Sequence, residues 1–262
     1  MLEEKVCVVT GSGGGIGRAT AVEMARRGAR VVVSDIDDDG GAQTVALVQA
    51  AGGEAIYVHC DVRREDQIEA LMSSACERFG GIDVLHNNAG VQESDFTEQA
   101  ALDTISNEVW DIVYEINLRA VWLCTKHAAP HLKRSARGPA IVNAASTGGL
   151  LGYPMCPAYS ATKGAVIQLT KATAIDLGPA VRCNCYCPAA VDTPMVRKYF
   201  AAAPDEQALL KALVGSHLIP RLGEPADVAR LVCFLASEQA SWITGSTYLI
   251  DGGSLAWRGS NG

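Results

Sequence analysis

The stretch that decides the fold runs Lys5-Val-Cys-Val-Val-Thr10 and continues as Gly11-Ser-Gly-Gly-Gly-Ile-Gly17. Its first part is the apolar run expected of a strand covered on both faces. The residues from Ile16 to Gly28 follow with the pattern of a helix that stops on glycine. A glycine-rich turn between a strand and a helix lets backbone N–H groups approach a pyrophosphate. This context favours a dinucleotide-binding unit over a plain glycine-rich hairpin.

The rest of the chain repeats the alternation of strand and helix. Further strands are predicted at Arg30–Ser34, Ala55–His59, Asp83–His86, Ala140–Ala145, Val181–Tyr186 and Thr247–Ile250. Further helices are predicted at Gly41–Ala51, Glu65–Phe79, Asn107–Leu132, Ala158–Leu177 and Pro225–Ser237, with helical material from Thr193 to Val214. Such alternation predicts an α/β protein with a Rossmann-type, doubly wound parallel sheet of about seven strands and helices on both faces. Because no proline-rich, serine-rich or low-complexity stretch divides residues 1–262, one domain is expected.

The composition excludes several classes of partner. The net charge is −7 and the 22 Lys and Arg residues are dispersed, which argues against nucleic acid and against an anionic membrane surface. The N-terminus lacks the pattern of a secretory signal, and no apolar stretch reaches the ~20 residues that span a bilayer. A cytoplasmic protein is expected.

No metal site is expected either. The nine cysteines are odd in number and scattered, as small buried apolar groups are. Cys183, Cys185 and Cys187 alternate along one strand and spread over ~13 Å, too far to converge on zinc. His127 and His131 have the i, i+4 spacing of metal ligands but no evident third ligand.

Acidic residues after the second strand predict the choice of cofactor. Asp35 follows Gly17 by eighteen residues, where its carboxylate can accept hydrogen bonds from a ribose and repel a 2′-phosphate. Arg18 is the only nearby cation in sequence and is expected to point away from that ribose. These charges favour NAD over NADP. Asp61 has two open roles, a hydrogen bond to the adenine amino group or a helix N-cap.

Tyr159 and Lys163 carry the strongest catalytic signal. Four residues apart on a predicted helix, they share one face, and Ser146 stands thirteen residues before Tyr159. A phenol has a pKa of about 10, too high for a base at neutral pH. A lysine charge ~4 Å away is worth roughly 4 kcal/mol at an effective dielectric near 20, or about three pKa units. Lys163 is therefore expected to lower the pKa of Tyr159.

These motifs together resemble the short-chain dehydrogenases/reductases across nearly the whole chain. The matching positions are Thr10-Gly-x-x-x-Gly-Ile-Gly17, Asp61-Val62, Asn87-Asn-Ala-Gly90, Asn117, Ser146, Tyr159-x-x-x-Lys163, Pro188 to Thr193 and Asp251-Gly252. The resemblance implies a catalytic tetrad of Asn117, Ser146, Tyr159 and Lys163, with Tyr159 as the acid-base and Ser146 on the substrate oxygen. It also implies that Asn117 bends its helix and that the protein is a homotetramer, with the tail Ala256-Trp257-Arg258 a candidate to reach a neighbour.

The glycine turn, the strand ends and the resemblance predict the contacts to NAD. They are Gly11, Gly15, Ile16, Gly17, Asp35, Ile36, Asp61, Val62, Asn88, Ala89, Gly90, Tyr159, Lys163, Val191 and Thr193. The chain departs from the family at Pro188-Ala189, where Pro-Gly is usual. Alanine costs little there unless the backbone needs a positive φ.

Substrate contacts are expected from loops beyond the carboxyl ends of the strands. The candidates are Ser146, Tyr159, Gln92, Tyr153, Met155 and Met195, with residues 192–218 as a lid. Glu93, Cys156, Tyr199 and Phe200 lie in the same segments, and the apolar members are equally consistent with plain core. As a pocket lining they favour a cyclic or moderately apolar secondary alcohol or ketone over a sugar.

Two alternatives stay open. A 3-oxoacyl-carrier-protein reductase shares the tetrad but uses NADPH and docks an acidic carrier, which Asp35 and the charge of −7 oppose. A non-catalytic nicotinamide-binding regulatory protein belongs to another class and predicts a damaged tetrad, whereas here it is complete.

Overall fold

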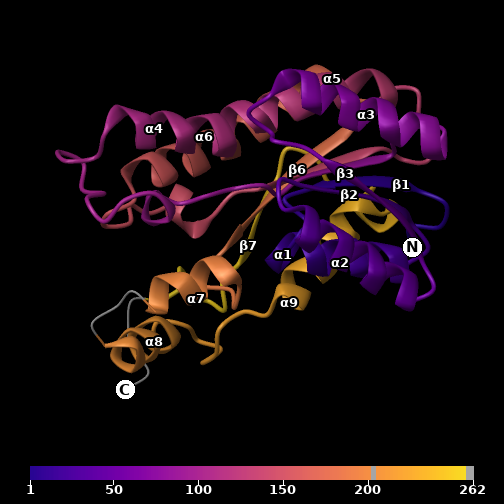
Figure 1. The fold of residues 1–262 in the computed structure, drawn as a ribbon. Coiled ribbons are helices and arrows are strands. Elements are labelled where there is room, and N and C mark those ends of the chain that lie inside the picture. The colour runs from indigo at the N-terminus through magenta and orange to yellow at the C-terminus, as the bar shows by residue number, and fades with distance from the viewer. Residues whose placement is uncertain (202–204, 258–262) are drawn as a thin grey trace.

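The computed structural model describes residues 1–201 and 205–257. Its centre is one sheet of seven parallel strands in the order β3-β2-β1-β4-β5-β6-β7 (Figure 1). The strands are β1 (Val6–Thr10), β2 (Arg30–Asp35), β3 (Glu54–His59), β4 (Val84–Asn87), β5 (Ala140–Ala144), β6 (Arg182–Pro188) and β7 (Thr247–Ile250). The order runs outward from β1 in one direction and from β4 in the other, so the prediction of a doubly wound parallel sheet is confirmed.

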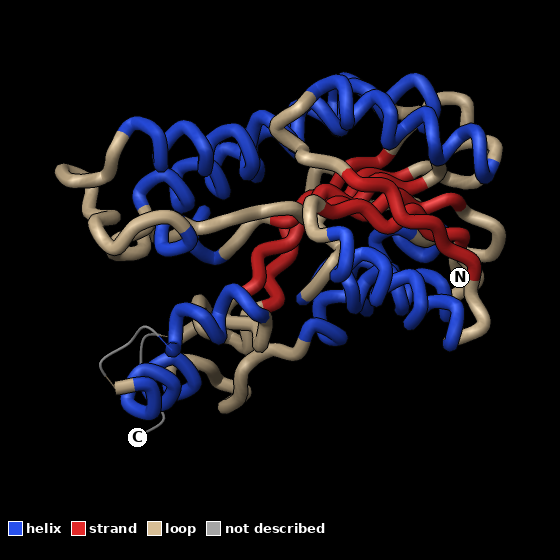
Figure 2. The backbone as a smooth tube through the Cα atoms, viewed as in Figure 1, coloured by secondary structure: helices blue, strands red, loops and turns tan. Residues whose placement is uncertain are grey.

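Helices cover both faces of this sheet (Figure 2). The helices are α1 (Gly15–Arg26), α2 (Asp38–Ala50), α3 (Glu65–Phe79), α4 (Asn107–Tyr114), α5 (Ala120–Leu132), α6 (Pro157–Leu177), α7 (Pro194–Ala201), α8 (Glu206–Gly215) and α9 (Pro225–Ala236). Figure 1 shows α3, α4, α5 and α6 on one side, and α1, α2 and α9 on the other. In the part of the chain described here, no helix is long and apolar enough to cross a bilayer.

The central strands are apolar throughout because they are covered on both sides. In β1, Cys7 and Val9 pack in a buried cluster with residues of α1 and α9. Val6 and Val8 point the other way, into a cluster with residues of α3 and α5. At ~25 cal/mol per Å² of apolar surface, this two-sided burial is the main stabilising contribution to the sheet.

Three helices differ in detail from the sequence-based prediction. α2 begins at Asp38, earlier than Gly41, because the side chain of Asp37 accepts a hydrogen bond from the backbone N–H of Gly40 and caps the helix. The helix predicted from Asn107 to Leu132 is interrupted by a π-helical segment, Glu115–Arg119. The predicted lid region contains two separate helices, α7 and α8, with residues 202–204 outside the described part.

The topology gathers the predicted site at one edge of the sheet. The carboxyl ends of β1 and β4 are neighbours in the sheet, yet the chain leaves them toward opposite faces. Such a switch point leaves a crevice in which ligands bind in open parallel sheets.

Candidate functional site

A cavity of about 540 Å³ opens at this edge and collects most of the predicted residues. Its lining joins the glycine turn, the end of β2, the segments after β3 and β4, the first turns of α6 and the start of α7. The predicted cofactor contacts in its wall are Gly11, Gly15, Ile16, Asp35, Ile36, Asp61, Val62, Asn88, Ala89, Gly90, Tyr159, Lys163 and Thr193. Gly17 and Val191 do not line it.

The glycine turn forms a cradle that side chains would fill. Gly11 has a φ of +62°, and a Cβ there would lie 2.7 Å from the Cα of Ala89. Gly15 has a φ of +51° and faces Thr193. Gly17 lies beneath the cradle, where a Cβ would run into the carbonyl oxygen of Gly11 and the amide of Asn88. Its hydrogen side chain therefore serves the packing of the turn on the strand.

The first turn of α1 is open to an anion. Gly14 is its N-cap and provides no side-chain cap, and no acidic residue lies in the first turn. The unsatisfied N–H groups and the helix dipole carry positive charge at this end. A pyrophosphate fits this cradle in shape and in charge.

The carboxylate of Asp35 is held by backbone N–H groups. One oxygen accepts from Gly13 at 2.7 Å, and the other accepts from Ile36 at 2.8 Å and Asp37 at 3.0 Å. The negative charge is thereby fixed in the cavity wall beside the glycine turn.

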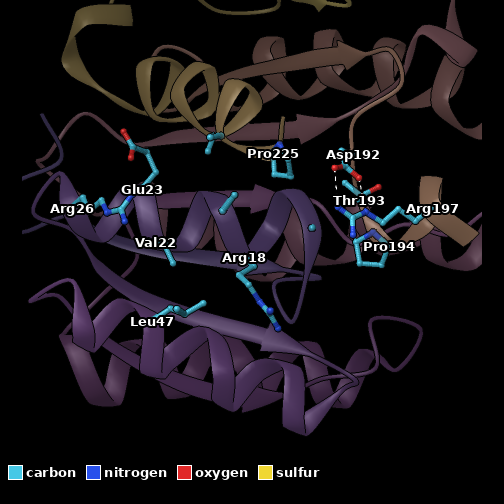
Figure 3. Close-up of a pocket in the computed structure, with 14 residues that line it drawn as sticks. Arg18, Val22, Glu23, Arg26, Leu47, Asp192, Thr193, Pro194, Arg197 and Pro225 are labelled. Atoms are coloured by element: carbon cyan, nitrogen blue, oxygen red, sulfur yellow. Dashed lines mark hydrogen bonds and ion pairs between the residues drawn. The ribbon is translucent and has the colours of Figure 1, made fainter. Parts of the chain in front are cut away.

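Arg18 lies outside this cavity. It lines a separate groove between α1 and α9, where its side chain extends toward α2 (Figure 3). Its guanidinium donates to the carbonyl oxygens of Gly13 and Gly40 and to Thr44 Oγ1. Arg63, a cation that the sequence analysis missed, does line the cofactor cavity.

The guanidinium of Arg63 forms an ion pair with the carboxylate of Asp61, in which Nη2 and Oδ2 are 2.6 Å apart. This hydrogen bond lowers the pKa of the Asp61 carboxyl. The helix-cap alternative for Asp61 is wrong, because Arg64 is the N-cap residue of α3 and gives no side-chain cap. The adenine alternative remains a prediction.

Tyr159 and Lys163 lie in the same cavity wall, both buried. Lys163 Nζ is 5.6 Å from the centre of the Tyr159 ring and donates to the carbonyl oxygen of Ala144 at 2.9 Å. Burial raises the pKa of Tyr159 to about 12, opposed by hydrogen bonds with Ser146 and Gln92. Burial lowers the pKa of Lys163 to about 8. The expected lowering of the Tyr159 pKa is therefore wrong for this structure, because burial disfavours the phenolate more strongly than the hydrogen bonds with Ser146 and Gln92 favour it.

Ser146 and Asn117 lie next to this pair. Ser146 Oγ accepts from the backbone N–H of Gly148 at 3.0 Å. Asn117 sits in the π-helical segment, where the backbone departs from α geometry; the bend expected at this residue stays a prediction. Its side chain accepts from Val91 N and donates to Val91 O, both at 2.9 Å. The four predicted tetrad residues thus come from two helical elements, the π-helical segment and α6, and from the segment that follows β5.

Residues 11–254 match the family model described as enoyl-(acyl carrier protein) reductase. The chain belongs to the short-chain dehydrogenases/reductases. Among curated members it is 38% identical over 256 residues to cyclopentanol dehydrogenase of Comamonas sp., covering 97% of this chain and 98% of that protein. It is 40% identical over 256 residues to cis-4-hydroxycyclohexanecarboxylate dehydrogenase of Sinomonas cyclohexanicum, covering 97% of each.

Solved structures agree with this assignment. The crystal structure of levodione reductase superposes with a TM-score of 0.91 at 32% identity, covering 98% of this chain and 100% of that one.

A 3-oxoacyl-(acyl-carrier-protein) reductase of Thermotoga maritima is 36% identical over 96% of this chain and 98% of its own length. The percentages of sequence identity to these relatives are similar. They therefore do not favour one substrate class over another for this chain.

The predicted substrate residues of this dehydrogenase/reductase lie in different places. Met195 lines the cavity, and Gln92 hydrogen-bonds Tyr159. The hydroxyl of Tyr153 is 2.6 Å from that of Thr147. Met155 is exposed and has a φ of +59°, just before α6. On α7, in the segment predicted as a lid, Phe200 is buried and Tyr199 is exposed.

Several cavity residues escaped the sequence analysis. They are Cys60, Arg63, Val91, Phe96, Ile112, Ile116, Ala144, Ala145 and Tyr186. Most are apolar residues at strand ends or on α4, where a residue that lines a cavity has the same sequence pattern as one in the core. Tyr186 could have been noticed, because a phenol within an apolar strand needs a hydrogen-bond partner.

The histidine pair on α5 does not converge. His127 Nε2 is 2.9 Å from Glu65, whereas His131 Nδ1 is 3.0 Å from Cys76 Sγ. Over residues 1–201 and 205–257, no three His, Cys, Asp or Glu side chains gather as a metal site would require.

Proposed function

We propose that this short-chain dehydrogenase/reductase transfers hydride between NAD(H) and a cyclic or moderately apolar secondary alcohol or ketone, with Tyr159 as the acid-base. One observation carries the proposal. The phenol of Tyr159 and the ammonium of Lys163 line the same cavity as the glycine cradle and Asp35. A proton-transfer group and an anion-binding turn thus share one space.

Each tetrad residue has a role in this proposal. A bound oxidised nicotinamide would accept the hydride, and its positive charge would favour the phenolate. Tyr159 exchanges the proton with the substrate oxygen, while hydrogen bonds with Ser146 and Gln92 favour its charged form. Lys163 adds a buried positive charge. Asn117 holds Val91 on the segment that follows β4.

The preference for NAD rests on Asp35. A 2′-phosphate would meet a carboxylate fixed by backbone N–H groups, and the guanidinium of Arg63 in the wall is already paired with Asp61. Kinetics with both cofactors test this point. A strong preference for NADP would contradict it.

The substrate class rests on the cavity wall and on the relatives. Phe96, Ile112 and Met195 give the wall apolar surface, and two relatives are named for cyclic alcohols. A panel of secondary alcohols, including cyclic alcohols, cyclic diols, hydroxysteroids and polyols, measures the preference. Turnover of polyols with cyclic alcohols inert would contradict it.

The carrier-protein reductase remains the second candidate because of the similarity to the Thermotoga enzyme. Its docking surface would need free basic side chains near the lid. Arg197 is instead paired with Asp192 at 2.6 Å (Figure 3), and Lys198 with Asp95 at 3.2 Å. Higher kcat/KM for a 3-oxoacyl thioester with NADPH than for any cyclic ketone would favour this candidate.

The decisive experiment for catalysis is Tyr159→Phe. Turnover should be abolished and NAD affinity nearly retained, because the substitution removes only the hydroxyl. Retained turnover would refute the role of Tyr159. Absence of turnover in the wild type with the whole panel, alongside NAD binding, would favour the regulatory alternative.

We also propose that the protein is a homotetramer. Trp110 and Tyr114 on α4 and Trp122 on α5 are 37%, 44% and 49% exposed, which supports burial of this face by another copy. Light scattering at assay concentration tests the assembly, and a monomer would contradict it.

A further inference from the structure

The segment after β4 contacts both the side-chain hydroxyl and the backbone N–H of Tyr159. The side chain of Gln92 hydrogen-bonds the Tyr159 hydroxyl. The next residue, Glu93, accepts the backbone N–H of Tyr159 through Oε1 at 2.9 Å. Two consecutive residues thus hold the phenol oxygen and the backbone of the same tyrosine.

Glu93 is an unusual carboxylate. Its side chain is fully buried, it has no ion pair among the residues described, and its Oε2 lacks a hydrogen-bond partner among them. Burial of a carboxylate without a counter-ion is costly, so its place needs a physical reason. The partial positive charge at the N-terminus of α6 supplies this reason.

Tyr159 lies in the first turn of α6, where backbone N–H groups have no partner within the helix. Pro157 has no N–H, and the N-cap residue Cys156 makes no side-chain cap. Glu93 therefore provides, from a distant part of the chain, the acceptor that the local sequence lacks. A charge-assisted hydrogen bond at a helix N-terminus is also favoured by the helix dipole.

The segment that carries Glu93 is itself fixed. The side chain of Asn117 bonds both polar backbone groups of Val91. Gln92 and Asp95 form a reciprocal capping box around the short turn Glu93–Asp95. The position of Tyr159 is thus tied to Asn117 through one short, ordered segment.

We infer that Glu93 is a positioning residue that holds the first turn of α6 so that the Tyr159 hydroxyl meets the substrate oxygen. The inference rests on the proposed role of Tyr159. A displacement of ~1 Å at a reacting group can cost on the order of 10²-fold in rate. Loss of the acceptor at residue 93 should therefore lower kcat more than it changes binding.

The test compares Glu93→Leu, which removes the acceptor at similar size, with Glu93→Gln, which retains one. Glu98→Leu is the matched control, an exposed glutamate on the same segment. Glu93→Leu should lower kcat by about tenfold to a hundredfold, with KM for NAD nearly unchanged. Amide hydrogen exchange in residues 157–163 should become faster. Glu93→Gln should stay within about threefold of the wild-type kcat, because its amide oxygen can still accept the backbone N–H of Tyr159.

The inference is overturned by an unchanged kcat in Glu93→Leu, by an equal loss in Glu93→Gln, or by a loss of kcat without faster exchange. If Glu93→Leu does not fold, Glu93→Met fills the space without a strong acceptor and replaces it. Exchange needs no substrate. If the wild type oxidises no alcohol, the proposed function fails, and the exchange rates alone decide whether Glu93 holds α6.

Discussion

His86 should make the stability of the protein depend on pH in a calculable way. It is fully buried on β4, its Nε2 lies 3.0 Å from the Tyr186 hydroxyl, and burial lowers its pKa to about 3. In the unfolded chain a histidine has a pKa of about 6.5. Because the folded pKa is lower, the unfolded state binds more protons below about pH 6.5, so stability falls as the pH falls.

The magnitude follows from linkage. Between about pH 8 and about pH 5, the free energy of unfolding should decrease by about 2 kcal/mol through His86 alone. At about pH 5 this value hardly changes if the folded pKa is one unit higher, because the folded imidazole is neutral in either case.

The assay is urea denaturation of the wild type and of His86→Gln at both pH values and one protein concentration. Glutamine can still hydrogen-bond Tyr186 but does not titrate. Contributions from the carboxylates and from other histidines are common to both proteins and cancel in the difference. The wild type should lose about 2 kcal/mol more than the variant on acidification, and equal losses would refute the assignment of a neutral, buried His86.

Three further outcomes are expected. Gly17→Ala should abolish NAD binding and lower the midpoint of thermal unfolding, because a Cβ would meet the Gly11 carbonyl oxygen and the Asn88 amide; binding by calorimetry at the wild-type level would contradict this. Ala189→Gly should leave kcat unchanged and lower the free energy of unfolding by ~0.4–1 kcal/mol, since Ala189 is not among the residues with a positive φ; a gain in stability would show that the loop prefers glycine. Alcohol oxidation should accelerate from neutral to alkaline pH, because burial raises the pKa of Tyr159 to about 12 and oxidation needs the phenolate; initial rates that are flat across this range would contradict that requirement.

The sequence predicted the sheet because the signals that define it are local. Apolar runs, glycine stops and the turn at Gly11 to Gly17 follow from residues adjacent in the chain, and the structure has all seven strands. The start of α2 and the division into α7 and α8 depend on single capping contacts such as Asp37 with Gly40, which shift boundaries by a few residues. The tail through Arg258 lies partly outside the described residues.

The sequence predicted which residues form the candidate site. It did not predict the direction in which their pKa values are shifted. The i, i+4 spacing of Tyr159 and Lys163 correctly placed both side chains on one cavity wall. Spacing says nothing of how much water the neighbouring elements exclude, and this exclusion sets both pKa values. For the same reason Glu93 was only one candidate among several loop residues. Its contact with Tyr159 joins segments 66 residues apart, and only the fold brings them together.

The direction of the two pKa shifts has a consequence for how the site works. A buried phenol with a raised pKa and a buried ammonium with a lowered pKa are both biased toward their neutral forms. The hydrogen bonds from Ser146 and Gln92 act against that bias at the phenol. A neutral Tyr159 is ready to donate its proton to a ketone, whereas alcohol oxidation first requires that proton to leave. Positive charge entering the cavity with a cofactor would therefore matter more for oxidation than for reduction, and the two directions should differ in their dependence on pH.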